Sequence, residues 1–175
     1  MPTVISGTTG VSLVEDASIT ASKVITGFCV QRVEATPMTT YTSSSNLYVG
    51  GDVIPTTASG FQACSLSITP KSATNRLAIR GNVVASGSSS GTLVVSLHKD
   101  AVAAAFAATK VDGTIDAVYT IPIVAEMVAG SISPITFRLY MHAVGSGSIF
   151  SNGNSGGRKL GGVSFSSLSV EEYVA

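Results

Sequence analysis

Charged residues are scarce in this chain. Asp, Glu, Lys and Arg make up 11% of its 175 residues, and ten basic residues balance ten acidic ones, so the formal net charge is zero. An average soluble domain carries about 25% charged residues. Nucleic-acid-binding proteins depend on a basic excess to neutralise phosphates, so the composition argues against that class. A net charge near zero also favours association between subunits.

Residues that build reactive centres are few as well. The chain has two cysteines, two histidines and no tryptophan. Cys29 and Cys64 do not make a disulfide framework in a chain of this length, so we expect free, buried thiols, with a mutual bridge as the alternative. His98 and His142 lie on the less apolar faces of expected strands, and no metal-ligand spacing surrounds them. We expect both histidines to be structural and predict no metal site.

Long apolar runs are missing too, although the mean hydropathy is +0.43. The longest candidate, residues 101–108, is too short to span a bilayer, which takes about 20 residues. The start of the chain has neither the basic region nor the continuous apolar region of a signal peptide. We therefore expect no membrane insertion.

What the sequence has instead is a series of short alternating segments separated by Gly, Ser and Pro. In residues 92–100, for example, Leu93, Val95 and Leu97 point to one face and His98 to the other. Alternation of this kind is typical of antiparallel sheets with one buried face. The expected strands are 28–33, 61–69, 75–84, 92–100, 117–127, 134–144 and 163–174. The fold class is therefore predicted to be all-β, an antiparallel β-sandwich that is jelly-roll-like.

Three local features refine this prediction. The alanine-rich residues 101–111 fit either a further strand or a helix, and the strand-like neighbours favour the strand. The alternation of the last segment shifts phase, which predicts a β-bulge near Ser166–Ser167. Asn152 and Gly153 both tolerate positive φ, which predicts a hairpin turn at that pair.

The first 27 residues differ from the rest, because they are rich in Ser, Thr and Gly and carry only isolated aliphatic residues. Such a segment is either a flexible tail or a segment that orders against partners, and regularly placed aliphatics favour the second alternative. We divide the chain into an extended N-terminal attachment and trimerisation segment, 1–27, and a β-sandwich domain, 28–175. The candidate attachment residues are Val4, Ile5, Val11, Leu13, Val14, Ile19 and Val24.

No catalytic constellation emerges from the sequence. The acidic neighbours in residues 15–16 and 171–172 point to opposite faces of a strand, so neither pair converges as a glycosidase requires. The glycine-rich residues 151–162 resemble a phosphate-binding loop, but Leu160 stands where the hydroxyl residue should follow Lys159. We predict no catalytic residues, no cofactor and no enzymatic activity. A polysaccharide depolymerase with two carboxylates in a groove is the enzymatic alternative.

Two blocks of sequence resemble a known family. Residues 65–83, SLSITPKSATNRLAIRGNV, and residues 151–173, SNGNSGGRKLGGVSFSSLSVEEY, are similar to motifs of bacteriophage tail-fibre and virion surface proteins. The N-terminal segment is similar to the attachment and shaft segments of tail fibres. The resemblance implies a jelly-roll-like β-sandwich that assembles as a homotrimer on the phage particle, and it implies no active site.

This resemblance leads to two hypotheses. In the first, the protein is a virion fibre made in the host cytoplasm, docked on tail, baseplate or capsid proteins, whose head contacts the host surface. Tyr41 and Tyr48 would then stack on a host glycan, or else only pack locally; the candidate contact loops are 41–52, 86–91 and 110–116. In the second hypothesis, the protein is a capsid decoration protein that stabilises the phage head.

Overall fold

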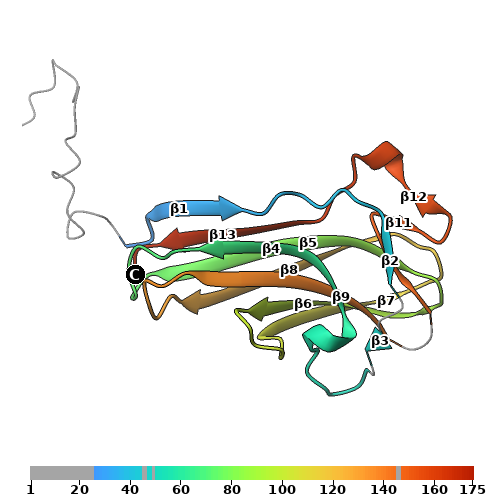
Figure 1. Ribbon diagram of the computed structural model, residues 1–175, viewed down its shortest axis with the longest axis horizontal. Helices are drawn as coiled ribbons and strands as arrows, with labels where there is room; N and C mark the ends of the chain where they lie inside the picture. The colour runs from blue at the N-terminus through green and yellow to red at the C-terminus, as the bar shows by residue number, and fades with distance from the viewer. Residues whose placement is uncertain (1–25, 45–46, 49, 145–146) are drawn as a thin grey trace, which may run out of the picture.

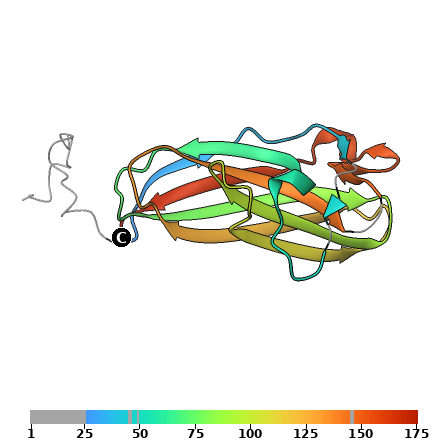
Figure 2. The same ribbon diagram turned by 60° about the horizontal axis from the view of Figure 1, so that its bottom comes forward.

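The structure is a computed structural model that describes residues 26–44, 47–48, 50–144 and 147–175 (Figure 1). Its regular elements are β-strands and two 3-10 turns, η3 (Thr57–Ser59) and η4 (Leu160–Gly162). The long strands run side by side along the long axis of the molecule, with the C-terminus at one end and residues 149–158 at the other (Figures 1 and 2).

Eight long strands form the body: β1 (Cys29–Glu34), β4 (Phe61–Ile68), β5 (Arg76–Gly87), β6 (Gly91–Lys99), β7 (Ala107–Gly113), β8 (Tyr119–Val128), β9 (Ile135–Val144) and β13 (Ser167–Tyr173). They pair in a nested order. The first pairs with the last, β1 with β13, and moving inward along the chain β4 pairs with β9, β5 with β8 and β6 with β7, all antiparallel. Two further pairings, β13 with β5 and β9 with β6, join these hairpins into the sheets β1–β13–β5–β8 and β4–β9–β6–β7. A nested hairpin rolled into two facing sheets is a jelly roll, so the predicted fold class is confirmed.

Short strands extend both sheets at one end. β10 (Ile149–Ser151) pairs with the end of β5 and with β2 (Thr42–Ser44), whereas β3 (Leu47–Tyr48) runs parallel to the end of β9. A small separate hairpin joins β11 (Gly153–Asn154) to β12 (Gly157–Arg158). The segment between β1 and β4 therefore crosses from one sheet to the other at this end of the sandwich.

The core lies between the two sheets and follows the alternation read from the sequence. Val95 and Leu97 of β6, Phe137 and Leu139 of β9, and Ile79 of β5 are all fully buried. Burying an aliphatic or aromatic side chain of this size stabilises the fold by about 1.5–3 kcal/mol. The faces that the alternation predicts to be buried therefore supply the hydrophobic stabilisation of the fold.

One local prediction is confirmed in part, and two are corrected. The strand favoured for residues 101–111 is present over 107–111 as part of β7, because pairing with β6 outweighs the helix propensity of alanine, whereas residues 101–106 form neither a strand nor a helix. The last strand begins only at Ser167 and pairs with β5 without a register shift, so no bulge is needed. The phase change reflects the 3-10 turn η4, which precedes the strand.

The glycine-rich hairpin turns three residues later than predicted. β11 and β12 pair through Asn154 and Gly157, so the turn lies between these residues and not at Asn152–Gly153. Asn152 does have a positive φ of 53°, but it is buried, and its side-chain amide donates to the carbonyls of Met38 and Thr40. These hydrogen bonds hold residues 38–40, which follow β1, against the end of the sandwich.

The cysteines are free, as predicted, but only one of them is buried. Cys64 lies in the core, where burial raises the pKa of its thiol, and a hydrogen bond from the backbone of Met38 lowers it by less. Cys29 is exposed, which corrects the prediction for that residue, because β1 is an edge strand of its sheet.

Candidate functional site

Glu172 carries the most densely hydrogen-bonded side chain on the described strands, and it is fully buried. Its Oε1 accepts hydrogen bonds from Asn75 Nδ2 at 2.6 Å and from the backbone N–H groups of Lys71 at 2.8 Å and Ser72 at 3.2 Å. Its Oε2 accepts from Gln31 Nε2 at 2.5 Å and from the N–H of Lys71 at 3.0 Å. We call this arrangement the Glu172 clamp.

The clamp joins the two sequence blocks that carry the family resemblance. Glu172 belongs to the second block, 151–173, whereas three of its four partner residues belong to the first, 65–83. The fourth partner, Gln31, comes from β1. The SITPKSATN turn is therefore folded around a carboxylate supplied by the final strand.

Hydrogen bonding decides the charge state of this carboxyl. Burial acts to raise the pKa of Glu172, but the hydrogen bonds from Gln31, Asn75 and the backbone N–H groups of Lys71 and Ser72 together hold it below the usual value. The side chain is thus ionised at neutral pH, with its charge neutralised by donors rather than by a cation.

We predict that this ionisation makes the protein sensitive to acid. Because the folded-state pKa of Glu172 is lower than the unfolded one, its stabilisation is complete above about pH 4.3 and is lost as the pH falls through the folded pKa. Urea unfolding at a series of pH values should show this loss in the wild type and a shallower loss in Glu172→Gln. Equal pH dependence of the two proteins would contradict the prediction.

The neighbouring carboxylate, Glu171, lies on the opposite face of β13, as expected of adjacent strand residues. It contacts Arg32 of β1 at 3.5 Å and Arg80 of β5 at 3.4 Å. Further along the sheet, Arg76 of β5 pairs with Glu126 of β8. The outer face of the β1–β13–β5–β8 sheet therefore concentrates charge in a chain that has little of it.

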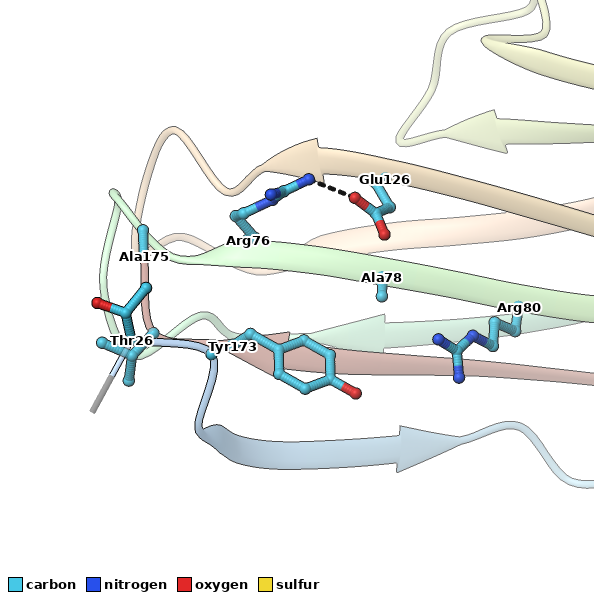
Figure 3. A pocket seen from close by; sticks show the side chains of 9 residues that line it. Thr26, Arg76, Ala78, Arg80, Glu126, Tyr173 and Ala175 are labelled. Atoms are coloured by element: carbon cyan, nitrogen blue, oxygen red, sulfur yellow. Dashed lines mark hydrogen bonds and ion pairs between the residues drawn. The ribbon is translucent and has the colours of Figure 1, made fainter. Parts of the chain in front are cut away.

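A groove of about 480 Å³ lies at one end of this charged face (Figure 3). The described chain begins here at Thr26, and it also ends here at Ala175. The predicted attachment residues between Val4 and Val24 lie outside the described residues, and their role stays a prediction. The groove is lined by Thr26, Gly27, Arg76, Ala78, Arg80, Glu126, Tyr173, Val174 and Ala175.

The two candidate receptor tyrosines do not lie on one sheet. Tyr41 precedes β2 in the first sheet; its hydroxyl donates to the carbonyl of Asn154 at 3.0 Å and its ring lies parallel to that of Phe150 at 6.1 Å. Tyr48 belongs to β3 in the second sheet, where its backbone pairs with Val144, and its side chain is outside the described part. Tyr41 thus packs locally, and a receptor role for either residue stays a prediction.

The two other candidate contact loops differ in extent from the prediction. Residues 88–90 form the tight turn that joins β5 to β6, within the predicted 86–91. Residues 110–113, by contrast, belong to strand β7, so the predicted loop 110–116 shrinks to its last three residues. Pairing with β6 fixes the rest of it in the sheet.

The glycine-rich residues 151–162 lead into a 3-10 turn and a strand, which does not match a phosphate-binding loop. The Arg158 guanidinium donates to the carbonyls of Gly162 at 3.4 Å and Thr39 at 3.5 Å, so it braces the loop. Beyond it, Leu160, Val163 and Phe165 are 75%, 78% and 46% exposed. These three residues form what we call the apolar knob.

Both histidines are buried, and their predicted structural role stays a prediction. Ser96 Oγ lies 2.8 Å from His98 Nε2 and 2.6 Å from His142 Nε2. All three side chains are on the outer face of the β4–β9–β6–β7 sheet, opposite Leu97 and Leu139. They are buried there because residues 50–60, the covering segment, and residues 101–106 lie over them.

Gly60 shows how closely the covering segment approaches His142. Its backbone has φ −133°, which alanine adopts without strain, but a Cβ there would lie 2.4 Å from His142 Cε1. We predict that Gly60→Ala raises the hydrogen-exchange rate of the Thr57 amide by roughly 5- to 100-fold, equal to about 1–3 kcal/mol. Gly156→Ala, whose nearest contact is 3.3 Å, is the control and should leave the rate unchanged. The same rate in both variants would refute the close packing.

The clamp and the histidine pair were both missed as units by sequence reasoning. The signal for the clamp was present, because one of two adjacent acidic residues in a half-buried strand must face inward and then needs donors. The donors, however, are about a hundred residues away in sequence, at Lys71, Ser72 and Asn75. No such signal marks the covering segment, which has few features of regular structure.

Within the described ranges, no three metal-binding side chains come together. The same part of the chain has no helix long and apolar enough to cross a membrane.

Comparison with known proteins gives distant structural similarity only. No family model matches the sequence, and no curated protein sequence matches it. Solved structures of infectious bursal disease virus are similar: the Gt strain with TM-score 0.40 and 16% identity, the Gx strain with 0.38 and 18%, and the VP2 subviral particle with 0.38 and 17%. The matches cover 83–84% of this chain but only 38–39% of those chains.

Proposed function

We propose that this protein is a structural component of a bacteriophage particle, a homotrimeric fibre with a jelly-roll head. Residues 1–27 dock on another virion protein, and the head faces the host surface. The protein acts through assembly and adhesion and is not an enzyme. Its place is the surface of the virion, after synthesis in the host cytoplasm.

The observation that carries the proposal is the Glu172 clamp. The residues by which the sequence resembles phage fibre and virion surface proteins are the ones that this clamp holds together. The shared motif therefore serves to fold a rigid sandwich end, which is what a structural protein of the particle requires. A motif that served catalysis would instead place its polar groups toward solvent or a cleft.

The described surface offers features suited to subunit contact. The apolar knob of Leu160, Val163 and Phe165 is exposed, and Leu160 is held there with a positive φ of 52°. Exposed apolar side chains gathered in this way mark interaction sites. In a cyclic trimer each knob would contact the neighbouring copy, and three copies of the N-terminal segment would be brought together.

A capsid decoration protein is the second candidate function. The exposed apolar residues and the low overall charge fit lateral contact with capsid subunits as well as they fit a fibre. Copy number separates the two functions, because fibres occur in on the order of tens of copies per particle and decoration proteins in hundreds. Binding of a host glycan at Tyr41 or Tyr48 belongs to the fibre function alone.

Light scattering of the purified full chain tests the assembly. We expect a mass three times the 17.7 kDa of one chain. Replacing Val163 by Asp should shift the population toward monomer, because a charge in a desolvated contact is unfavourable. Val124→Asp, at another exposed valine on β8, is the matched control. A monodisperse monomer at high concentration would overturn the trimer.

A further inference from the structure

The histidine pair on the outer face of the second sheet has a defined hydrogen-bond direction. His142 Nδ1 lies 3.0 Å from the carbonyl of Ser59, which only accepts, so His142 carries its proton on Nδ1. Its Nε2 is then an acceptor and receives the Ser96 hydroxyl proton. The Ser96 oxygen in turn accepts from His98 Nε2–H. The relay therefore places one proton on each ring, on Nδ1 of His142 and on Nε2 of His98. The remaining ring nitrogen, His98 Nδ1, is buried and makes no hydrogen bond.

The covering segment is held by this relay and by backbone hydrogen bonds to residues 103 and 105, which connect β6 to β7. The N–H of Thr57 donates to the carbonyl of Ala103 at 3.0 Å, and the N–H of Ala105 donates to Pro55 at 2.9 Å. Gly60 packs directly against the His142 ring. Opening the segment would thus expose the His142 ring to water and leave the ladder between β6 and β9 intact, while residues 101–106 stay over His98.

We propose that residues 50–60 are an acid-released covering segment, held closed by the neutral His98–Ser96–His142 relay. This inference concerns regulation of the surface and is independent of the function proposed above. Release at mildly acidic pH would uncover the outer face of β6 and β9.

The relay accommodates one added proton but not two. A proton on His98 Nδ1 leaves the hydrogen bond to Ser96 in place and points toward the backbone carbonyls of residues 102–104. With a proton on Nε2, His142 would become a second N–H donor facing the Ser96 oxygen, beside His98. The hydroxyl proton of Ser96 would then lose its acceptor, which is the Nε2 of His142. Two cationic rings would also repel each other across one hydroxyl group.

Burial and the surrounding charges favour the neutral state of both rings. Burial lowers the pKa of His98 and of His142, and the positive charge of Arg138 on β9 lowers the pKa of His98 further, as His98 does for His142. The backbone carbonyls near each ring act in the opposite direction and raise the pKa. Tyr140, whose ring is 5.0 Å from that of His98, directs its hydroxyl to Gln62. No carboxylate offsets these effects within the relay itself.

Titratable groups are also few in the elements that pack on the relay. The covering segment contains one acidic residue, Asp52, which is exposed, and residues 101–106 contain none. On β6 the neighbour is Lys99, and beyond the strand Asp100 directs Oδ1 to the N–H of Thr136. The histidines are therefore the groups that change charge in the mildly acidic range.

Hydrogen exchange followed by NMR between pH 7.5 and 5 tests the proposal on the full chain. Protection factors, corrected for intrinsic pH dependence, should fall about tenfold or more per pH unit below roughly pH 6.5 for Thr57 and Ala105. The amides of Val95 and Leu139 in the core ladder should keep their protection. Constant protection of Thr57 and Ala105, or a fall shared with the core amides, would overturn the proposal.

Two substitutions remove the titration and keep one hydrogen bond each. In His98→Gln the amide nitrogen can donate to Ser96, and in His142→Asn it can donate to Ser59. The double variant should hold the covering segment equally at pH 7.5 and 5, and an unchanged pH response would contradict the relay. If the double variant does not fold, nitrogen-15 spectra of wild-type imidazoles serve instead. They should show Nε2–H on His98 and Nδ1–H on His142; the opposite tautomers would refute the mechanism.

Discussion

Replacing Glu172 by Gln is expected to lower the free energy of unfolding by about 2–5 kcal/mol. The buried carboxylate accepts five hydrogen bonds from Gln31, Lys71, Ser72 and Asn75. With the amide nitrogen of Gln in the place of Oε2, Gln31 loses its acceptor at this residue, and Lys71, Ser72 and Asn75 keep theirs at the remaining oxygen. The remaining hydrogen bonds are then made to a neutral amide, and such bonds contribute about 0.5–1.5 kcal/mol each, compared with about 1.5–3 kcal/mol for bonds to a charged group. Each unsatisfied buried donor costs about 1–3 kcal/mol. Urea unfolding at pH 7 measures the effect.

Glu171→Gln is the matched control for this prediction. The same chemical change, one residue away on the same strand, removes the partly exposed ion pairs with Arg32 and Arg80 and leaves an amide oxygen that can accept the hydrogen bond from the Tyr173 hydroxyl. Such pairs contribute about 0–1 kcal/mol. If the two variants were equally stable, the clamp would not be the element that folds the SITPKSATN turn.

Deleting residues 1–25 is expected to reduce incorporation into phage particles by at least about tenfold while the sandwich stays folded. The deletion ends before Thr26 and keeps the hydrogen bond from Gly27 N–H to the carbonyl of Val174. Because a trimer would attach through three copies at once, loss of all three removes the avidity as well as the contact. Quantitative mass spectrometry of purified particles gives the copy number, and circular dichroism checks the fold.

A second variant distinguishes the sequence of the segment from its length. It keeps all 25 residues but replaces Val4, Ile5, Val11, Leu13, Val14, Ile19 and Val24 by Ser. The attachment hypothesis predicts the same loss as the deletion. Normal incorporation of either protein would show that docking uses another part of the chain.

The strands of the sandwich could be predicted because their signal is local. Alternation in residues 92–100 and 134–144 identified the buried faces of β6 and β9, and Val95, Leu97 and Leu139 are indeed in the core. The exact start of β13 at Ser167 could not be predicted, since apolar residues in 163–165 continue the pattern while the backbone forms η4 first. The exposed apolar residues Val163 and Phe165 alternate with polar residues as strand residues do, so the sequence does not distinguish them from the strand that follows.

The functional clusters depend on pairings that no local pattern specifies. The Glu172 clamp needs β13 beside β5 and the 69–75 turn at the same end of the sheet. The histidine relay needs β6 paired with β9 in the register that sets Ser96 against Tyr140, with an irregular segment folded over the sheet's outer face. In the sequence, both histidines lie on the polar faces of expected strands, and no pattern there predicts that these faces are covered.

Imaging of the phage particle at subunit resolution tests the central claim most directly. The account predicts three copies of the jelly roll around a threefold axis, with residues 1–25 in contact with another virion protein and the apolar knob at the interface between copies. Tens of such trimers per particle would indicate a fibre, and hundreds a decoration protein (both on the order of magnitude set by particle symmetry). Purified particles that lack this chain would contradict the account.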